Sequence, residues 1–125
     1  MPRMALVVDD SMLIRHAVCR YFEERGFLVE SATNGLEALE VLLHITPNII
    51  VTDLQMPKMT GSELITVLKN RRDTADLPII VLAGKKSISD SLGDNRASSV
   101  VYKDIDIDDQ LDRAVSAIYP EVARR

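Results

Sequence analysis

The 125-residue sequence predicts a one-domain α/β protein with a doubly wound parallel β-sheet and helices on both of its faces. Three observations predict this class. Short apolar runs alternate along the chain with longer segments of helical spacing. The runs are mostly apolar, as is typical of strands that are buried on both faces of a parallel sheet. Three of the runs are closed by a charged residue, namely Asp9, Asp53 and Lys103. We expect the domain to span 1–120, with 121–125 as a tail or the start of a linker.

In the first half of the chain, capping and helix-ending residues separate three predicted strands, Met4–Val8, Leu28–Ser31 and Ile49–Asp53. Ser11 is a favourable N-cap and Gly26 a favourable C-cap for a helix over Met12–Arg25. The apolar positions expected to face its core are Leu13, Ile14, Ala17, Val18, Tyr21 and Phe22. A second helix begins after the turn Asn34-Gly35, with Asn34 as its candidate N-cap, and is stopped by Pro47. Its expected buried stripe is Leu36, Leu39, Leu42 and Leu43.

In the second half, Gly61 opens a third helix that ends at Arg71-Arg72, with Leu64, Ile65 and Leu68 facing inward. The remaining predicted strands are Pro78–Ala83 and Val100–Tyr102. The segment Ser87–Asn95 is rich in Ser, Asp and Asn, which compete with the helical backbone, so we expect a short or irregular fourth helix. A last helix begins near Asp106 and Asp108 and buries Leu111, Ala114, Val115 and Ile118.

Composition restricts the class of partner. The net charge of −4, without a basic stripe, argues against nucleic acid as a direct partner. No apolar run has the length of a membrane span, and the single Cys19 cannot form an internal disulfide. We therefore expect a cytoplasmic protein, a monomer or weak dimer, without a direct nucleic-acid or membrane partner.

Four charged residues lie at predicted strand ends: Asp9, Asp10, Asp53 and Lys103. The carboxyl ends of parallel strands meet at one edge of the sheet, where such folds bind ligands. Carboxylate oxygens are preferred ligands of Mg²⁺, and a bound cation lets a phosphoryl group approach an aspartate without prohibitive repulsion. An aspartate carboxylate can attack phosphorus and form an acyl phosphate. The four residues therefore predict a site for a divalent cation and a phosphoryl group.

These residues, together with the run Asp53–Gly61, resemble the receiver domains of two-component response regulators. This flavodoxin-like family includes the chemotaxis regulator, and the resemblance covers essentially the whole chain. It implies a five-stranded sheet in the order 2-1-3-4-5. It also implies a signalling domain rather than an enzyme, with at most metal-dependent self-phosphorylation from small donors and slow self-dephosphorylation. A sensor histidine kinase or phosphotransfer protein would be the phosphoryl donor, and an output domain would follow Arg125.

The resemblance also implies a role for each matching residue. Asp53 would be the phosphoacceptor, and Lys103 would contact the phosphoryl oxygens. Mg²⁺ or Mn²⁺ would be held by Asp10 as principal carboxylate, by Asp9 largely through water, by Asp53 and by the backbone carbonyl of Gln55. Met56-Pro57 and Gly61 would shape the loop after the third strand.

The chain departs from the family at three positions. Ala83 stands where the family has a Ser or Thr that donates a hydrogen bond to the phosphoryl group, and a methyl group cannot donate one. Val100 stands where the family has an aromatic switch residue. Asp104 replaces a proline that is preceded by a cis bond, so we expect a trans bond after Lys103. The usual coupling through a Thr and an aromatic residue cannot operate with Ala83 and Val100.

Two hypotheses follow from these departures. In the favoured one, Asp53 is phosphorylated and the signal takes another route, for example by ordering 84–95. In the alternative, the domain is a pseudo-receiver docking module that signals through protein–protein interaction without phosphorylation. A dehalogenase-type phosphatase is disfavoured because Gln55 replaces its general acid. A flavin carrier is disfavoured because Asp9-Asp10 would repel the flavin phosphate.

Overall fold

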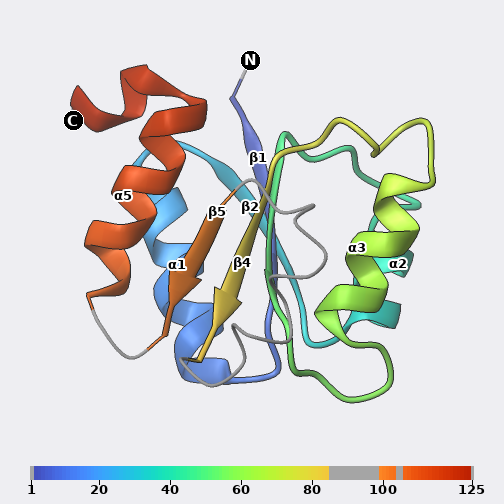
Figure 1. Ribbon diagram of the computed structural model, residues 1–125. Helices are drawn as coiled ribbons and strands as arrows, with labels where there is room; N and C mark the ends of the chain where they lie inside the picture. Colours follow the sequence, from blue (N-terminus) through green and yellow to red (C-terminus); the bar gives the residue numbers. More distant parts are fainter. Residues whose placement is uncertain (1, 85–98, 104–105, 125) are drawn as a thin grey trace.

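The computed structural model describes residues 2–84, 99–103 and 106–124 (Figure 1). Within them the chain forms one parallel sheet of five strands in the order β2-β1-β3-β4-β5. The predicted fold class and strand order are confirmed. The strands are β1 (Met4–Val8), β2 (Leu28–Ala32), β3 (Ile49–Asp53), β4 (Ile79–Ala83) and β5 (Ser99–Tyr102). The helices are α1 (Met12–Glu24), α2 (Gly35–Val41), α3 (Gly61–Lys69), α5 (Ile107–Ile118) and the 3₁₀ helix η2 (Pro120–Arg124).

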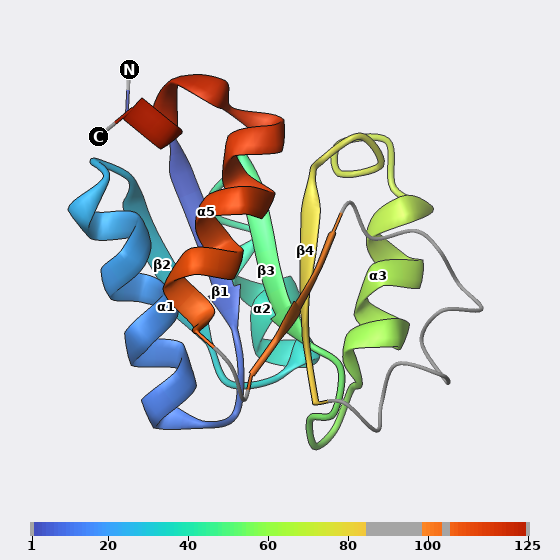
Figure 2. The ribbon, with the colours of Figure 1, turned by 60° about the vertical axis from the view of Figure 1, so that its left-hand side comes forward.

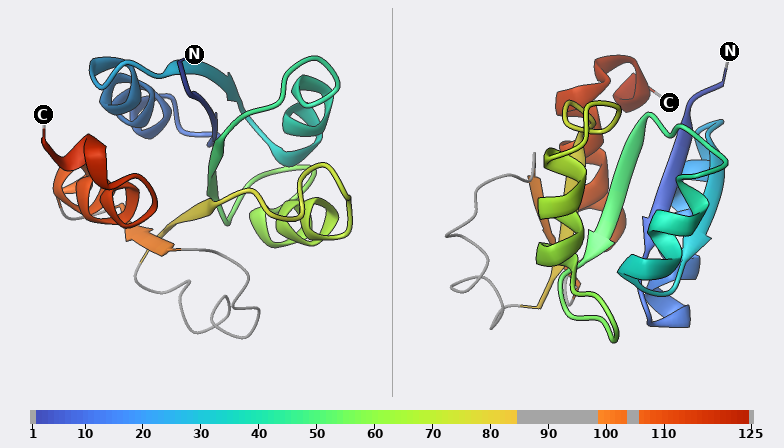
Figure 3. Two further views of the ribbon diagram at one scale, coloured as in Figure 1. Left: turned by 90° about the horizontal axis from the view of Figure 1, so that it is seen from above. Right: turned by 90° about the vertical axis from the view of Figure 1, so that its right-hand side faces the viewer.

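The sheet divides the core into two layers. α1 and α5 cover one face, and α2 and α3 cover the other, as Figures 1, 2 and 3 show from different sides. Successive strand residues point to opposite faces, so alternate residues of β1, β3 and β4 enter opposite layers. The layer under α1 and α5 includes Ala5, Val7, Ile49, Val51, Ile80, Leu82, Tyr21, Phe22, Leu111 and Val115. The layer under α2 and α3 includes Leu6, Val8, Ile50, Ile79, Val81, Ala83, Ala38, Leu64, Ile65 and Leu68.

The register of the sheet places the strand ends side by side. Asp53, the last residue of β3, pairs with Leu82, and Ala83, the last residue of β4, pairs with Tyr102. β1 lies on the other side of β3 and runs directly into Asp9. The charged residues at the ends of β1, β3 and β5 consequently project from the same edge of the sheet.

The capping residues predicted for the first two helices are confirmed. The Ser11 side chain accepts from Ile14 N–H, and the Asn34 side chain accepts from Glu37 N–H. Gly26 follows the end of α1 with φ of 86°, a left-handed conformation that favours glycine.

Three leucines that the sequence predicts as buried are exposed, with fractions of 82% for Leu13, 47% for Leu36 and 74% for Leu43. Leu13 lies nine positions before the buried Phe22, or about two and a half helical turns, and so faces the other way. On α2 the buried residues are Gly35 and Ala38, and Leu36 points away from them. The helix ends at Val41, well before Pro47, so Leu43 lies beyond the regular stripe. The predicted ends of both helices were too late in the sequence: α2 ends before Pro47, and α3 ends at Lys69 rather than at Arg71-Arg72.

The last described residues pack back on the domain. Val122 of η2 is buried in the α1–α5 layer, and the Tyr119 hydroxyl donates to the Asn48 carbonyl at 3.2 Å. Arg3 forms an ion pair with Glu121, and its guanidinium lies 4.1 Å from the Tyr119 ring centroid. The predicted division between 1–120 and 121–125 remains a prediction.

Two predicted features lie outside the described residues: the irregular fourth helix over Ser87–Asn95 and the trans bond between Lys103 and Asp104. Among the described residues, no helix combines the length and the apolar character that crossing a membrane requires.

Candidate functional site

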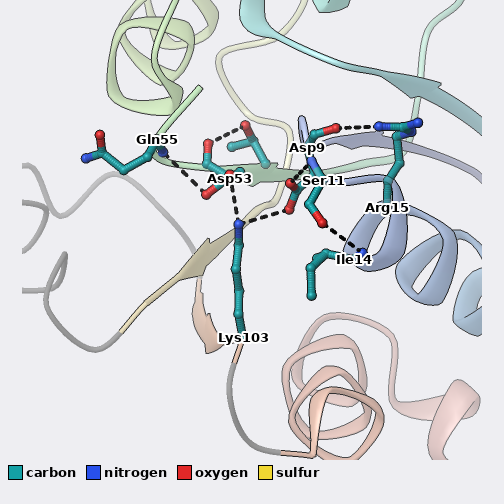
Figure 4. A network of polar contacts seen from close by, with 8 residues as sticks. Asp9, Ser11, Ile14, Arg15, Asp53, Gln55 and Lys103 are labelled. Carbon is teal, nitrogen blue, oxygen red and sulfur yellow. Dashed lines mark hydrogen bonds and ion pairs between the residues drawn. The ribbon is translucent and has the colours of Figure 1, made fainter. Parts of the chain in front are cut away.

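Four of the predicted site residues meet at the carboxyl edge of the sheet. Figure 4 shows the Lys103 side chain reaching toward the carboxylates of Asp53 and Asp9. Asp9, Asp10 and Asp53 each offer one carboxylate oxygen, and these oxygens lie within 4.8 Å of one another. Asp9 and Asp53 are buried, whereas Asp10 is exposed, so the cluster opens to solvent on the Asp10 side.

Asp53 is held from two sides at the end of β3. Its Oδ2 lies 2.8 Å from Lys103 Nζ, and its Oδ1 accepts from the backbone N–H of Gln55 at 3.3 Å. Its backbone carbonyl accepts from the Thr52 hydroxyl at 2.9 Å. Only 4% of the residue is exposed, so its carboxylate is held in one orientation at the rim of the core.

Lys103 follows the last residue of β5, and its backbone N–H donates to the Ala83 carbonyl at 3.1 Å. Burial alone would lower the pKa of this ammonium. The hydrogen bond to Asp53 and the negative charges of Asp9 and Asp53 outweigh burial, so the pKa of Lys103 is raised. The side chain therefore stays an ammonium at neutral pH, shared between two carboxylates.

Asp9 is fully buried and incompletely satisfied. Its Oδ1 accepts from Ser11 N–H at 2.8 Å, and its carbonyl accepts from Arg15 Nη1 at 2.9 Å. Its Oδ2 lies 3.2 Å from Lys103 Nζ as an ion pair, but no well-aligned hydrogen bond within the described part of the chain reaches that oxygen. Burial raises the pKa of Asp9, and the charge of Asp53 raises it further, against the lowering effects of Ser11 N–H and Lys103.

The donor set fits a hard divalent cation. Three carboxylates and one ammonium leave an excess of two negative charges within a few ångströms. The under-satisfied Asp9 oxygen faces this cluster, and oxygen ligands of this kind suit Mg²⁺ or Mn²⁺. The individual ligand roles of Asp9, Asp10 and the Gln55 carbonyl remain predictions; the Gln55 side chain is exposed.

Gly61 ends the loop from Leu54 to Thr60 and lies close to the backbone of Asp53 and Leu54. A Cβ at Gly61 would lie 2.0 Å from the Asp53 carbonyl oxygen, and the Gly61 N–H donates to the Leu54 carbonyl at 2.9 Å. No side chain fits at this approach. Thr60 and Glu63 then form a reciprocal capping box that starts α3 and lowers the pKa of Glu63.

The two atypical positions are occupied by hydrocarbon side chains. Ala83 is 1% exposed at the end of β4, one residue beyond the partner of Asp53 in the sheet register. Val100 is half-buried on β5, where it pairs with Val81 and packs against the layer under α2 and α3. Neither side chain carries a hydrogen-bonding group.

Two contributors were not anticipated from the sequence. Arg15 fixes the Asp9 backbone, and Thr52 bonds to the Asp53 carbonyl. A basic residue in the first turn after an acidic strand end is a usable signal for the first contact. The hydroxyl of a buried threonine within an apolar strand, next to the acceptor, is a signal for the second.

Comparison with known proteins agrees with this geometry. Residues 5–115 match the family described as response regulator receiver domain. Response regulator MprA from Mycobacterium sp. (strain KMS) is 38% identical over 90 residues, which are 72% of this chain and 38% of that protein. The chain therefore spans well under half the length of this curated relative.

Solved structures share the fold over nearly the whole chain. Chemotaxis response regulator CheY4 of Vibrio cholerae matches with a TM-score of 0.80 and 26% identity, covering 98% of this chain and 99% of its own. The signal receiver domain of a signal transduction histidine kinase from Syntrophus aciditrophicus matches with a TM-score of 0.83 and 28% identity, covering 98% and 94%. The sequence match and the site at the carboxyl edge lead to one conclusion: the chain belongs to the response regulator receiver domains, which are signalling domains of two-component systems rather than classical enzymes.

Proposed function

We propose that Asp53 accepts a phosphoryl group from a sensor histidine kinase or a phosphotransfer protein, with Mg²⁺ or Mn²⁺ bound beside it. The observation that carries the proposal is the 2.8 Å distance between Lys103 Nζ and Asp53 Oδ2. An aspartate that faces an ammonium, with two further acids in reach, is arranged to receive a dianionic group and its counter-ion.

The proposed step is a displacement at phosphorus. A carboxylate oxygen of Asp53 forms the new P–O bond while the P–N bond to the donor histidine breaks, and the imidazole leaves with the bonding electron pair. The Lys103 ammonium, already at the carboxylate, stabilises the charge on the phosphoryl oxygens. Asp9, Asp10, Asp53 and the Gln55 carbonyl would hold the metal ion, which supplies neutralisation of negative charge.

We further infer that the phosphoryl group is reported without the usual pair of switch side chains. Ala83 offers no hydroxyl to a phosphoryl oxygen, and Val100 offers no aromatic ring to move inward. The acids and Lys103 thus support acceptance of the phosphoryl group. Transmission of the signal must use residues other than Ala83 and Val100.

The test is incubation of the protein with Mg²⁺ and a small acyl phosphate, followed by intact-mass measurement. We expect a gain of one phosphoryl group that Asp53→Asn abolishes and that a chelator prevents. Asp76→Asn, an exposed acid away from the cluster, serves as the matched control and should label like wild type. If neither the small donor nor any histidine kinase labels Asp53, the phosphate-free docking module becomes the better description.

A further inference from the structure

The Gln110 side chain makes a two-point hydrogen bond to the backbone of Tyr102. Its Oε1 accepts from Tyr102 N–H at 2.9 Å, and its Nε2 donates to the Tyr102 carbonyl at 2.8 Å. β5 is an edge strand, and these two groups point to its open side, because the next residue bonds back to β4. The Gln110 amide therefore takes the place that the backbone of a sixth strand would occupy.

Gln110 is itself on a firmly anchored element. It lies in the first turn of α5, and its backbone N–H donates to the Asp106 carbonyl at 3.1 Å. Leu111 is fully buried and Ala114 nearly so, which fixes this part of α5 on the sheet. Figures 2 and 3 show α5 lying close alongside β5. The two hydrogen bonds thus tie the end of the edge strand to a helix that packs on the core.

This tie acts on the peptide unit that carries Lys103. The Tyr102 carbonyl and the Lys103 N–H belong to one planar peptide group. Gln110 Nε2 holds the carbonyl of this group at 2.8 Å, while the Ala83 carbonyl holds its N–H at 3.1 Å. The group is therefore fixed on both sides, although within the described residues β5 has only one neighbouring strand, β4. A fixed backbone matters because the lysine side chain has four rotatable bonds between its Cα and the ammonium.

From these contacts we propose that Gln110 is a positioning residue, which sets the Lys103 ammonium against Asp53 by holding the Tyr102–Lys103 peptide. The inference rests on the proposed phosphoryl transfer to Asp53 and adds to it the residue that orients its cationic partner. It also links the site to α5 through the Gln110 amide and the Tyr102 backbone, a connection that does not use the side chains of Ala83 and Val100.

The test compares wild type with Gln110→Leu, which removes both hydrogen bonds, and Gln110→Glu, which keeps only the acceptor for Tyr102 N–H. Arg113→Ala, an exposed residue one turn later on α5, is the matched control. Three quantities are measured on each protein: the Tyr102 amide exchange rate by NMR, Mg²⁺ affinity by calorimetry, and the maximal rate of phosphorylation by an acyl phosphate at saturating Mg²⁺.

For Gln110→Leu we expect faster Tyr102 amide exchange and a maximal rate lower by on the order of tenfold. Mg²⁺ affinity should not fall, because a displaced Lys103 competes less for the carboxylates. Gln110→Glu should lie between Gln110→Leu and wild type, and Arg113→Ala should match wild type. General loosening of the domain would weaken Mg²⁺ binding as well as slow the transfer. A slower transfer without weaker Mg²⁺ binding therefore distinguishes a positioning role from such loosening.

The inference alone would be overturned by an unchanged rate despite an unprotected Tyr102 amide, or by parallel losses of rate, Mg²⁺ affinity and thermal stability. A Tyr102 amide that stays protected in Gln110→Leu would also refute it. If wild type itself takes no phosphoryl group on Asp53, the proposed function fails and the positioning role falls with it.

Discussion

The ammonium of Lys103 lies 2.8 Å from the Asp53 carboxylate, and it stands in the same charge cluster in which a divalent cation would bind. Before any metal or phosphoryl group arrives, Lys103 already neutralises part of the acidic cluster. The cation and Lys103 therefore compete for the same carboxylate charge, while both favour an incoming phosphoryl group.

Lys103→Met is expected to separate these two effects. Removing the ammonium should tighten Mg²⁺ binding, because the carboxylates lose their internal counter-ion. It should slow phosphorylation by on the order of 10–100-fold, because the phosphoryl oxygens lose their fixed cation. Calorimetry and mass-spectrometric rates measure the two effects, with Lys69→Met, on α3, as the charge-matched control. Weaker Mg²⁺ binding in Lys103→Met would contradict the competition.

Asp9→Asn is expected to stabilise the metal-free protein. The pKa of Asp9 is raised in the folded state, chiefly by burial and then by Asp53. Folding therefore favours the protonated form of Asp9. The stability that this protonation adds is fully present below the ordinary Asp pKa of about 3.9, and it is lost as pH rises through the higher pKa of the folded state. A neutral Asn can keep the bond from Ser11 N–H without the charge.

Thermal unfolding in a chelator at pH 7 should give a higher Tm for Asp9→Asn than for wild type. Adding Mg²⁺ should raise the Tm of wild type more than that of the variant, since binding to the folded state stabilises it. A lower Tm for the variant in chelator would show that the Asp9–Lys103 ion pair outweighs the burial of the charge.

Gly61→Ala is expected to destabilise the domain by about 2–3 kcal/mol, because the added methyl group would overlap the Asp53 backbone carbonyl. Gly84→Ala is the matched control, since a Cβ there meets no atom of the described residues within 4 Å. That control should change stability by less than about 1 kcal/mol. Urea unfolding followed by circular dichroism compares the two, and equal losses would argue against the close approach at Gly61.

Tyr21→Phe is expected to cost about 1 kcal/mol, because the Tyr21 hydroxyl donates to Asp112 Oδ1 at 2.7 Å across the α1–α5 contact. Burial and this hydrogen bond raise the pKa of Tyr21. The contribution is therefore complete below about pH 10, the ordinary Tyr pKa, and is lost as pH rises above it. Tm measured from pH 8 to 11 should fall more steeply for wild type than for Tyr21→Phe; identical slopes would rule out this contribution.

The central strands β1, β3 and β4 could be predicted because each is an almost wholly apolar run buried on both faces of the sheet, and β1 and β3 lead directly to the acids of the site. The buried face of a helix was harder to predict where the helix is short. In α2 the spacing predicts that Leu36 and Leu43 belong to the buried stripe, but the helix ends at Val41 and buries the small Ala38. Leu39 and Leu42 do pack on the core as predicted, but a pattern of large apolar residues does not reveal that Gly35 and Ala38 are buried on that side as well.

The sequence shows which charged residues stand at the strand ends, but it does not show which tertiary contacts these residues make. Sequence cannot tell which of two adjacent acids enters the core: Asp9 is buried against Lys103, and Asp10 is exposed. The close approach at Gly61 and the bonds from Gln110 to Tyr102 depend on how a loop and a helix return to the sheet. Such contacts follow from the register of packed elements rather than from local patterns.

The most direct test of the central claim locates the phosphoryl group chemically. The protein is labelled with a small acyl phosphate in Mg²⁺, reduced with borohydride, which converts an aspartyl phosphate to homoserine, and mapped by peptide mass spectrometry. We predict homoserine at position 53 and at no other aspartate, with none formed in a chelator. Absence of homoserine at position 53 in a labelled protein, or homoserine at Asp9 or Asp10 instead, would contradict the assignment of Asp53 as the phosphoacceptor.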